Sequence, residues 1–119
     1  MYTIGKTFDF SASHALKHLP EGHPCHRLHG HNYSVMLTLA NVTLDELGMV
    51  VDYGKLAEFR DYLNESYDHQ HLNDVMDRPP TAENIARQLY DWARQRWPQT
   101  LSVMVSETDK TFAEYGRDD

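Results

Sequence analysis

Cysteine is nearly absent from this sequence, in which Cys25 is the only one. A single thiol excludes an internal disulfide framework and leaves three roles for Cys25: an inert buried side chain, a metal ligand or a nucleophile. Long apolar runs are also missing, and no stretch approaches the ~20 residues of a membrane-spanning helix. The first residues, Met-Tyr-Thr-Ile-Gly-Lys, lack the pattern of a signal segment, so we expect a cytoplasmic protein.

Positive charge is scarce as well. The chain has 11 Lys and Arg against 18 Asp and Glu, a formal net charge of −7. This balance argues against generic nucleic-acid binding, which needs a basic face. An anionic substrate would need positive charge concentrated at its site. The length of 119 residues suits a single domain, and we expect residues 1–119 to form one unit without linkers or repeats.

Histidine is the residue in excess: there are eight, and six of them lie between positions 14 and 31. Residues 2–14 alternate between apolar and polar, which predicts a half-buried strand that ends on the apolar face at His14. Residues 29–39 alternate in the same way and place His29 and His31 on the apolar face. If the two strands pair through the loop at 15–28, three imidazoles meet at one edge of the core. Three such ligands suit Zn²⁺ with a fourth position open.

The rest of the chain predicts two helices and two more strands. Asp52 is a candidate N-cap for a helix with Leu56, Phe59 and Leu63 facing inward. Residues 68–80 are polar and irregular, and Thr81 is the expected cap of a second helix that ends near Trp97. Residues 101–105 and 111–115 follow as strands. The resulting order, ββααββ, predicts an α+β domain with two helices on one face of a four-stranded antiparallel sheet.

Further candidate groups remain open to more than one interpretation from the residues alone. Cys25 would close a structural Cys-His₃ zinc site as a fourth ligand, or act as a nucleophile or base beside the metal. Glu107 continues the apolar row of its strand, so it either faces a cavity and binds a pair of N–H donors or has already reached solvent. The pair Asp68-His69 is either a proton carrier with its orienting acid or ordinary loop surface.

Taken together, these motifs resemble a known family. Ser-Ala-Ser-His14, Cys25-x-x-x-His29-Gly-His31, Asp68-His69, Pro80-Thr81-Ala82-Glu83-Asn84 and Glu107-Thr108 are similar to the 6-pyruvoyl-tetrahydropterin synthase superfamily. The three residues between the cysteine and His-Gly-His resemble most closely its bacterial 6-carboxy-tetrahydropterin synthase group (QueD type). The motifs extend from His14 to Tyr115, almost the whole chain.

The resemblance implies a T-fold assembled as a homohexamer, a dimer of trimers, with active sites at subunit interfaces. It implies zinc on His14, His29 and His31, Cys25 as the proton-abstracting base, and a relay of Asp68 and His69. Glu107 would anchor the pterin, with Thr81 and Glu83 near the pterin pocket. The implied reaction converts 7,8-dihydroneopterin triphosphate to 6-carboxy-5,6,7,8-tetrahydropterin, releasing triphosphate and acetaldehyde, on the route to queuosine. A set of basic side chains, suggested only by position, would hold the triphosphate: Lys17, His18, His23 and Arg27.

Two alternatives remain at this point. A pyruvoyl-tetrahydropterin synthase or a related pterin side-chain lyase would use the same residues and give a different product. A non-catalytic, zinc-stabilised oligomerisation module would instead use Cys25 to close the metal shell. The second alternative differs from both enzymes in making Cys25 necessary for zinc binding.

Overall fold

Four strands form one antiparallel sheet in the order β1-β2-β3-β4, in a computed structural model that describes residues 1–118. Their bounds are β1 Tyr2–His14, β2 His29–Asn41, β3 Thr100–Thr108 and β4 Thr111–Gly116. Strands β1 and β2 pair along their full length, from Tyr2 opposite Asn41 to His14 opposite His29. The predicted alternation, the four-stranded antiparallel sheet and the order of its strands along the chain are confirmed, and the first two strands pair.

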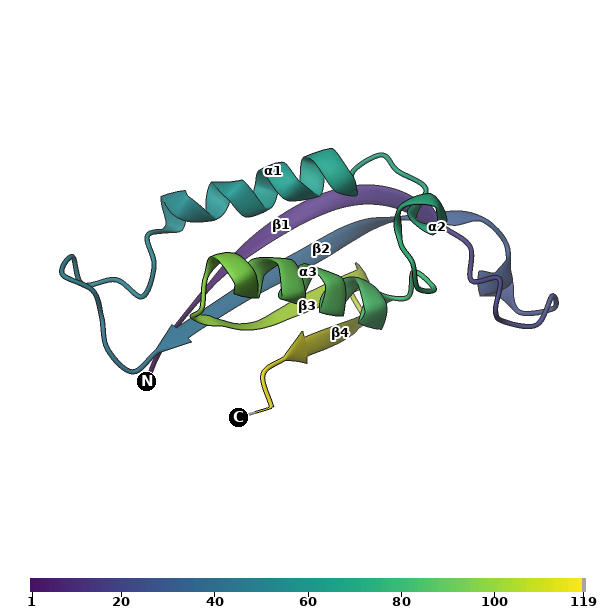
Figure 1. The fold of residues 1–119 in the computed structure, drawn as a ribbon. Helices are drawn as coiled ribbons and strands as arrows, with labels where there is room; N and C mark the ends of the chain where they lie inside the picture. Colours follow the sequence, from purple (N-terminus) through teal and green to yellow (C-terminus); the bar gives the residue numbers. More distant parts are fainter. Residues whose placement is uncertain (119) are drawn as a thin grey trace.

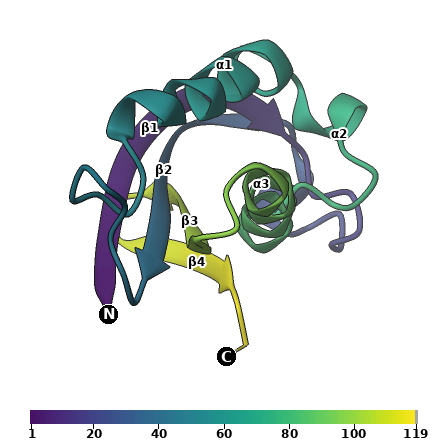
Figure 2. The same ribbon diagram turned by 60° about the vertical axis from the view of Figure 1, so that its left-hand side comes forward.

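Two longer helices, α1 (Ala57–Ser66) and α3 (Ala82–Arg96), pack on the sheet (Figures 1 and 2). Phe8 of β1 contacts Phe59 of α1, with ring centroids 5.0 Å apart, and Phe59 in turn lies 5.9 Å from Trp92 of α3. Both helices therefore cover the same face of the sheet. The apolar side chains of alternate strand positions are buried beneath them, with Val35, Leu37, Val103 and Val105 fully inaccessible to solvent. This arrangement confirms the predicted α+β architecture.

Short helical elements add detail that the apolar periodicity does not reveal. Asp52 accepts a hydrogen bond from the Gly54 amide, but the element it caps is a 3₁₀ turn, η2 (Tyr53–Leu56), which leads into α1. The segment expected to be irregular contains α2 (Leu72–Val75), and the loop between β1 and β2 contains η1 (Pro24–His26). Elements of one turn carry too few apolar positions to show a period. Within residues 1–118, no helix has the length and apolar character needed to cross a membrane.

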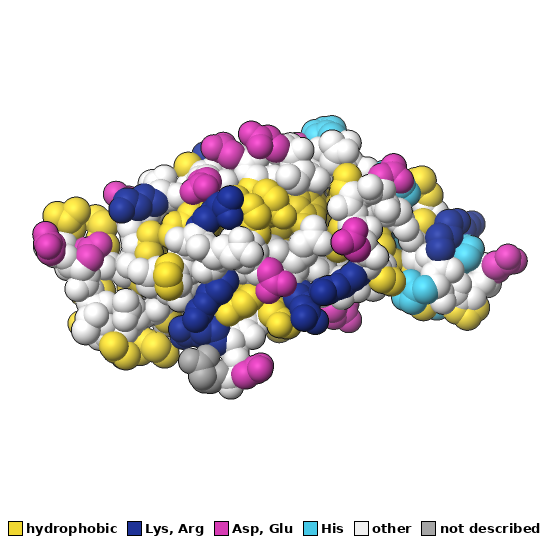
Figure 3. All heavy atoms as spheres, in the orientation of Figure 1, with side chains coloured by type: hydrophobic (Ala, Val, Ile, Leu, Met, Phe, Trp, Pro, Cys, Tyr) yellow, Lys and Arg dark blue, Asp and Glu magenta, His cyan; other side chains and the backbone are white. Residues whose placement is uncertain are grey.

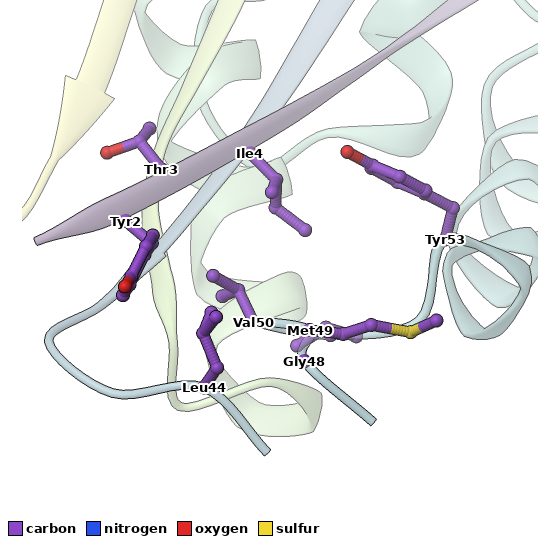
Figure 4. A pocket seen from close by; sticks show the side chains of 9 residues that line it. Tyr2, Thr3, Ile4, Leu44, Gly48, Met49, Val50 and Tyr53 are labelled. Carbon is purple, nitrogen blue, oxygen red and sulfur yellow. The ribbon is translucent and has the colours of Figure 1, made fainter. Parts of the chain in front are cut away.

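The two ends of the elongated molecule differ in chemistry. The loop at 15–28 projects at one end of the molecule (Figure 1). Figure 3, drawn from the same side, shows histidine side chains on the surface at this end. At the opposite end, an apolar hollow of about 260 Å³ lies between the start of β1 and the segment after β2. Figure 4 shows the side chains of Ile4, Leu44 and Val50 directed into it. No charged residue lines this hollow.

Candidate metal centre

Three histidines and one glutamate converge where β1, β2 and β3 meet at the loop end of the core. His14 ends β1 directly opposite His29, and His31 lies opposite Ala12 two positions along β2. Glu107, near the end of β3, joins them, and one nitrogen or oxygen atom from each of the four residues lies within 4.8 Å of the others. The register places all three imidazoles on the apolar face, as their parity predicts.

The backbone fixes the tautomers of two of these histidines. The Nδ1 of His14 lies 2.7 Å from the carbonyl oxygen of Pro80, and the Nδ1 of His29 lies 2.7 Å from that of Arg27. Because a carbonyl oxygen can only accept, each Nδ1 must carry the hydrogen. When both rings are neutral, each Nε2 atom therefore presents a lone pair, and these two atoms lie 2.8 Å apart. Two facing lone pairs repel each other, and a cation between them removes that repulsion.

The surroundings of His31 and Glu107 point the same way. The His31 Nε2 lies 2.8 Å from Oε2 of Glu107, but it is buried and makes no hydrogen bond of acceptable geometry. The same carboxylate oxygen lies 3.5 Å from the His14 Nε2. The donor atoms are thus close without being directed along hydrogen bonds to one another. Imidazole nitrogens with a carboxylate oxygen are an ordinary ligand set for zinc, so the residues fit a metal ion.

Burial keeps His14 in the form that binds metals. Its side chain is inaccessible to solvent, and this desolvation lowers the pKa of His14 below its usual value, against the opposing effects of the Pro80 carbonyl and Glu107. A lowered pKa means that the ring stays neutral at pH values where an exposed histidine begins to be protonated. No proton therefore has to be displaced from His14 when a metal binds near neutral pH.

The Pro80 carbonyl is held in place by the start of α3. The Thr81 hydroxyl accepts a hydrogen bond from the Asn84 amide, as expected of an N-cap, and the Asn84 side chain donates to the Pro79 carbonyl at 2.9 Å. Thr81 therefore serves the helix terminus that orients His14. Glu83 lies exposed in the first turn of α3. Neither Thr81 nor Glu83 belongs to the group of metal donors.

Cys25 lies in η1, half-buried, and contributes mainly backbone contacts. Its amide donates to the Nδ1 of His23 at 3.1 Å, and its carbonyl accepts from the Leu16 amide at 2.9 Å. Among residues 1–118, the clustered donor atoms include the Glu107 carboxylate and no sulfur. The structure thus brings Glu107 to the three histidines and does not bring Cys25 into that donor group.

Asp68 and His69 lie on the outer edge of β1. Asp68 accepts from the Ser11 amide at 2.9 Å through one oxygen and contacts the Nδ1 of His69 at 2.8 Å through the other. The Ser11 hydrogen bond, followed by that from His69, lowers the pKa of the Asp68 carboxyl, which favours an ionised acid oriented toward the imidazole. The His69 side chain is 84% exposed and stands outside the chain's own metal donors.

Two supporting groups have no counterpart among the residues expected from the sequence. The Asn73 side chain binds both backbone groups of Ala15, accepting from its amide at 2.8 Å and donating to its carbonyl at 2.7 Å. This fixes the backbone next to His14. The Pro80 carbonyl is the second group. Backbone acceptors carry no residue signature, and only the two prolines before a capped helix mark a rigid segment there.

Comparison with known proteins identifies the family. The family model described as 6-pyruvoyl tetrahydropterin synthase matches residues 3–118, nearly the whole chain. The chain belongs to the 6-pyruvoyl tetrahydropterin synthase family. The resemblance seen in the sequence motifs is thereby confirmed, and a cluster of histidines able to hold a metal accords with membership of this family.

Two relatives of this family member cover it almost completely. A 6-carboxy-5,6,7,8-tetrahydropterin synthase of Synechocystis sp. is 37% identical, over 97% of this chain and 93% of that protein. The protein of the same name from Bacillus subtilis is 30% identical, over 96% of this chain and 84% of its own length. The structure of Caenorhabditis elegans 6-pyruvoyl tetrahydropterin synthase superposes with a TM-score of 0.86 at 24% identity, covering 98% of this chain and 96% of that one. That likeness shows the shared fold.

Proposed function

We propose that this chain is a zinc-dependent 6-carboxy-5,6,7,8-tetrahydropterin synthase, a carbon–carbon lyase that acts on 7,8-dihydroneopterin triphosphate. The observation that carries the proposal is the convergence of His14, His29 and His31 beside Glu107, with the Nε2 atoms of His14 and His29 2.8 Å apart. The names of the relatives at 30% and 37% identity support this product over others of the family. The pathway served would be that of queuosine and related deazapurines.

Glu107 is the group proposed to bind the pterin. A carboxylate accepts two parallel N–H donors, and the amino-pyrimidine edge of a pterin offers such a pair. Since Glu107 lies 2.8 Å from the His31 Nε2, a ring held by this carboxylate would have its substituent close to the metal donors. Zinc on the three imidazoles would supply Lewis-acid stabilisation of the negative charge that develops when a neighbouring C–H is deprotonated. Thr81 and Glu83 would contribute to the pocket around the pterin.

Cys25 is the proposed base and His69 the proposed proton carrier, oriented by Asp68. Nearby positive charge stabilises a thiolate, the form of cysteine that can accept a proton, and a bound zinc ion would provide such charge. His69 can carry a proton because Asp68 fixes its Nδ1 as a donor and leaves the Nε2 on an exposed ring. The histidine would then return the proton to the pterin side chain.

The exposed relay favours an assembly of several copies. His69 is 84% exposed, and β1 and β4 are the outer strands of the sheet, so strands of other copies could pair with the parts of these edges that residues 68–71 do not cover. We propose a homohexamer, a dimer of trimers, in which strand pairing between copies brings the Asp68–His69 pair of one copy to the metal donors of another. Size-exclusion chromatography with light scattering tests the assembly.

The test of the function is incubation of the zinc-loaded protein with 7,8-dihydroneopterin triphosphate, followed by mass analysis of the products. We expect 6-carboxytetrahydropterin and acetaldehyde. A pyruvoyl product with loss of triphosphate alone would establish the alternative enzyme, which the fold shared with the Caenorhabditis elegans protein also accommodates. If neither product forms when the protein is fully loaded with zinc, the chain is not a pterin side-chain lyase.

A further inference from the structure

A small basic cavity lies against the backbone that holds His14. Its volume is about 180 Å³, and its lining residues are Ala15, Lys17, His18, Asn73, Arg78, Pro79 and Pro80. Ala15 directly follows His14 in the chain, and the Pro80 carbonyl is the group that accepts the hydrogen bond of the His14 ring. The metal donor His14 is therefore hydrogen-bonded to a residue that lines this cavity.

The walls of the cavity are rigid. Asn73 binds the amide and the carbonyl of Ala15 at 2.8 and 2.7 Å, which ties the end of β1 to α2. On the other side, the Pro79 carbonyl accepts from the Thr81 amide at 2.8 Å and from the Asn84 side chain at 2.9 Å. Proline has a fixed φ, so this segment gains further stiffness. A cavity with such walls needs little reorganisation when it binds a ligand.

The charge of the cavity is opposite to that of the chain. The protein carries a formal net charge of −7, yet Lys17, His18 and Arg78 line this one space. Asp74 and Asp77 precede Arg78 in the sequence, but among the described residues, 1–118, no carboxylate forms an ion pair with Lys17 or Arg78. The positive charge that Lys17 and Arg78 bring to the cavity is thus not neutralised by an ion pair.

We propose that this cavity binds a phosphoryl anion. Arg and Lys around a shared space are the donors that bind phosphate through charge-assisted hydrogen bonds. Resting on the proposed function, the cavity would hold the triphosphate of the substrate while Glu107 holds the pterin and the metal donors lie between. His23 and Arg27, placed near a triphosphate by sequence position, do not line it. Arg78 and Asn73, which are distant in sequence, do.

The experiment titrates the zinc-loaded 119-residue chain with sodium tripolyphosphate by isothermal calorimetry. We compare wild type with Arg78→Gln and Lys17→Gln. The control is Lys55→Gln, which removes the same charge from an exposed position in η2. Loss of a charge-assisted hydrogen bond should raise the dissociation constant at least tenfold in each cavity variant and leave the control within about twofold. Higher salt should weaken the wild-type binding. Zinc content is measured after each titration because polyphosphates also bind zinc.

Equal affinity of all four proteins for tripolyphosphate would overturn the proposal. Equal weakening in all three variants would also overturn it, because it would reflect only the loss of one positive charge from the protein. Binding that disappears when zinc is removed and is unaffected by Arg78→Gln would place the anion on the metal instead. None of these measurements needs turnover, so they separate the anion site from the reaction. If the reaction is also as proposed, Arg78→Gln should raise KM for the triphosphate substrate at least tenfold with little change in kcat.

Discussion

Replacing His29 by alanine separates the metal-binding role of the cluster from its contribution to the fold. Zinc that binds only the folded protein stabilises it by about 2.7 kcal/mol at a free concentration of one hundred times its dissociation constant. Unfolding of 119 residues carries an entropy of roughly 0.25 kcal/mol per kelvin. Zinc should therefore raise the wild-type Tm by about 11 °C at this concentration.

The variant should respond differently with and without metal. Losing one of three imidazoles should weaken zinc binding about a hundredfold or more, since even supporting residues are worth ten- to a hundredfold. The same zinc concentration would then stabilise His29→Ala by only about 0.4 kcal/mol, a shift of about 2 °C. Without zinc, the variant should melt close to wild type, because His29 is only half-buried and its removal ends the repulsion of two Nε2 lone pairs at 2.8 Å.

The assay is thermal unfolding followed by circular dichroism at one protein concentration, with and without buffered zinc. The matched control is His23→Asn in the same loop, which keeps a side-chain acceptor for the Cys25 amide and should show the full wild-type shift. If zinc raises the Tm of His29→Ala as much as that of wild type, His29 is not a ligand and the facing lone pairs have another explanation.

Four further substitutions test other parts of the site. Cys25→Ala should keep its zinc and assembly and lose turnover, as judged by metal content and product formation, and loss of zinc would instead favour the structural module. Glu107→Gln should keep zinc on the three imidazoles and raise KM for the pterin substrate about 30-fold. This factor corresponds to the loss of about 2 kcal/mol of charge-assisted hydrogen bonding. An unchanged KM would exclude a contact between Glu107 and the pterin. Asn73→Ala leaves both backbone groups of Ala15 unpaired, which should lower the free energy of unfolding by about 2 kcal/mol and the Tm by about 8 °C. The Tm of the exposed control Asn64→Ala should change little. Equal Tm values for the two variants would refute the role of Asn73 in holding Ala15. His69→Asn should abolish turnover. Its Tm should stay equal or rise, because asparagine tolerates the φ of 60° at this position better than histidine does. A clear fall in Tm would contradict this explanation.

Parity was sufficient to predict the sheet and the place of the three histidines. His14, His29 and His31 continue apolar rows, and strand pairing through one loop can bring such rows together in only a few ways. The caps at Asp52 and Thr81 were likewise predictable, because a side-chain oxygen before a helical turn is a local feature. What parity could not decide was whether Glu107 faces solvent or the cluster, since that depends on where β3 ends relative to β2.

Contacts between distant segments were beyond the reach of the sequence. The Asn73 clamp on Ala15 spans 58 positions and the Pro80 contact with His14 spans 66. Each depends on where a one-turn helix or a proline pair comes to lie against the end of β1, and neither segment has a periodicity that reports its position. For the same reason Arg78 could not be associated with Lys17 until the fold brought them to one cavity.

His69 shows how backbone geometry can indicate function at an exposed position. Its φ of 60° makes it the single non-glycine residue among 1–118 with a positive φ, a conformation that costs roughly 1 kcal/mol or more. The exposed side chain returns little packing energy, so the conformation is retained by other contacts: the His69 amide donates to the Ser11 carbonyl at 2.6 Å, and Asp68 accepts from the Ser11 amide. These bonds hold an imidazole outward with its Nδ1 fixed by an ionised acid. Folding stability alone gives no reason to keep a histidine in this conformation, whereas the proton transfer proposed for His69, to the site of a neighbouring copy, would require an oriented and accessible ring.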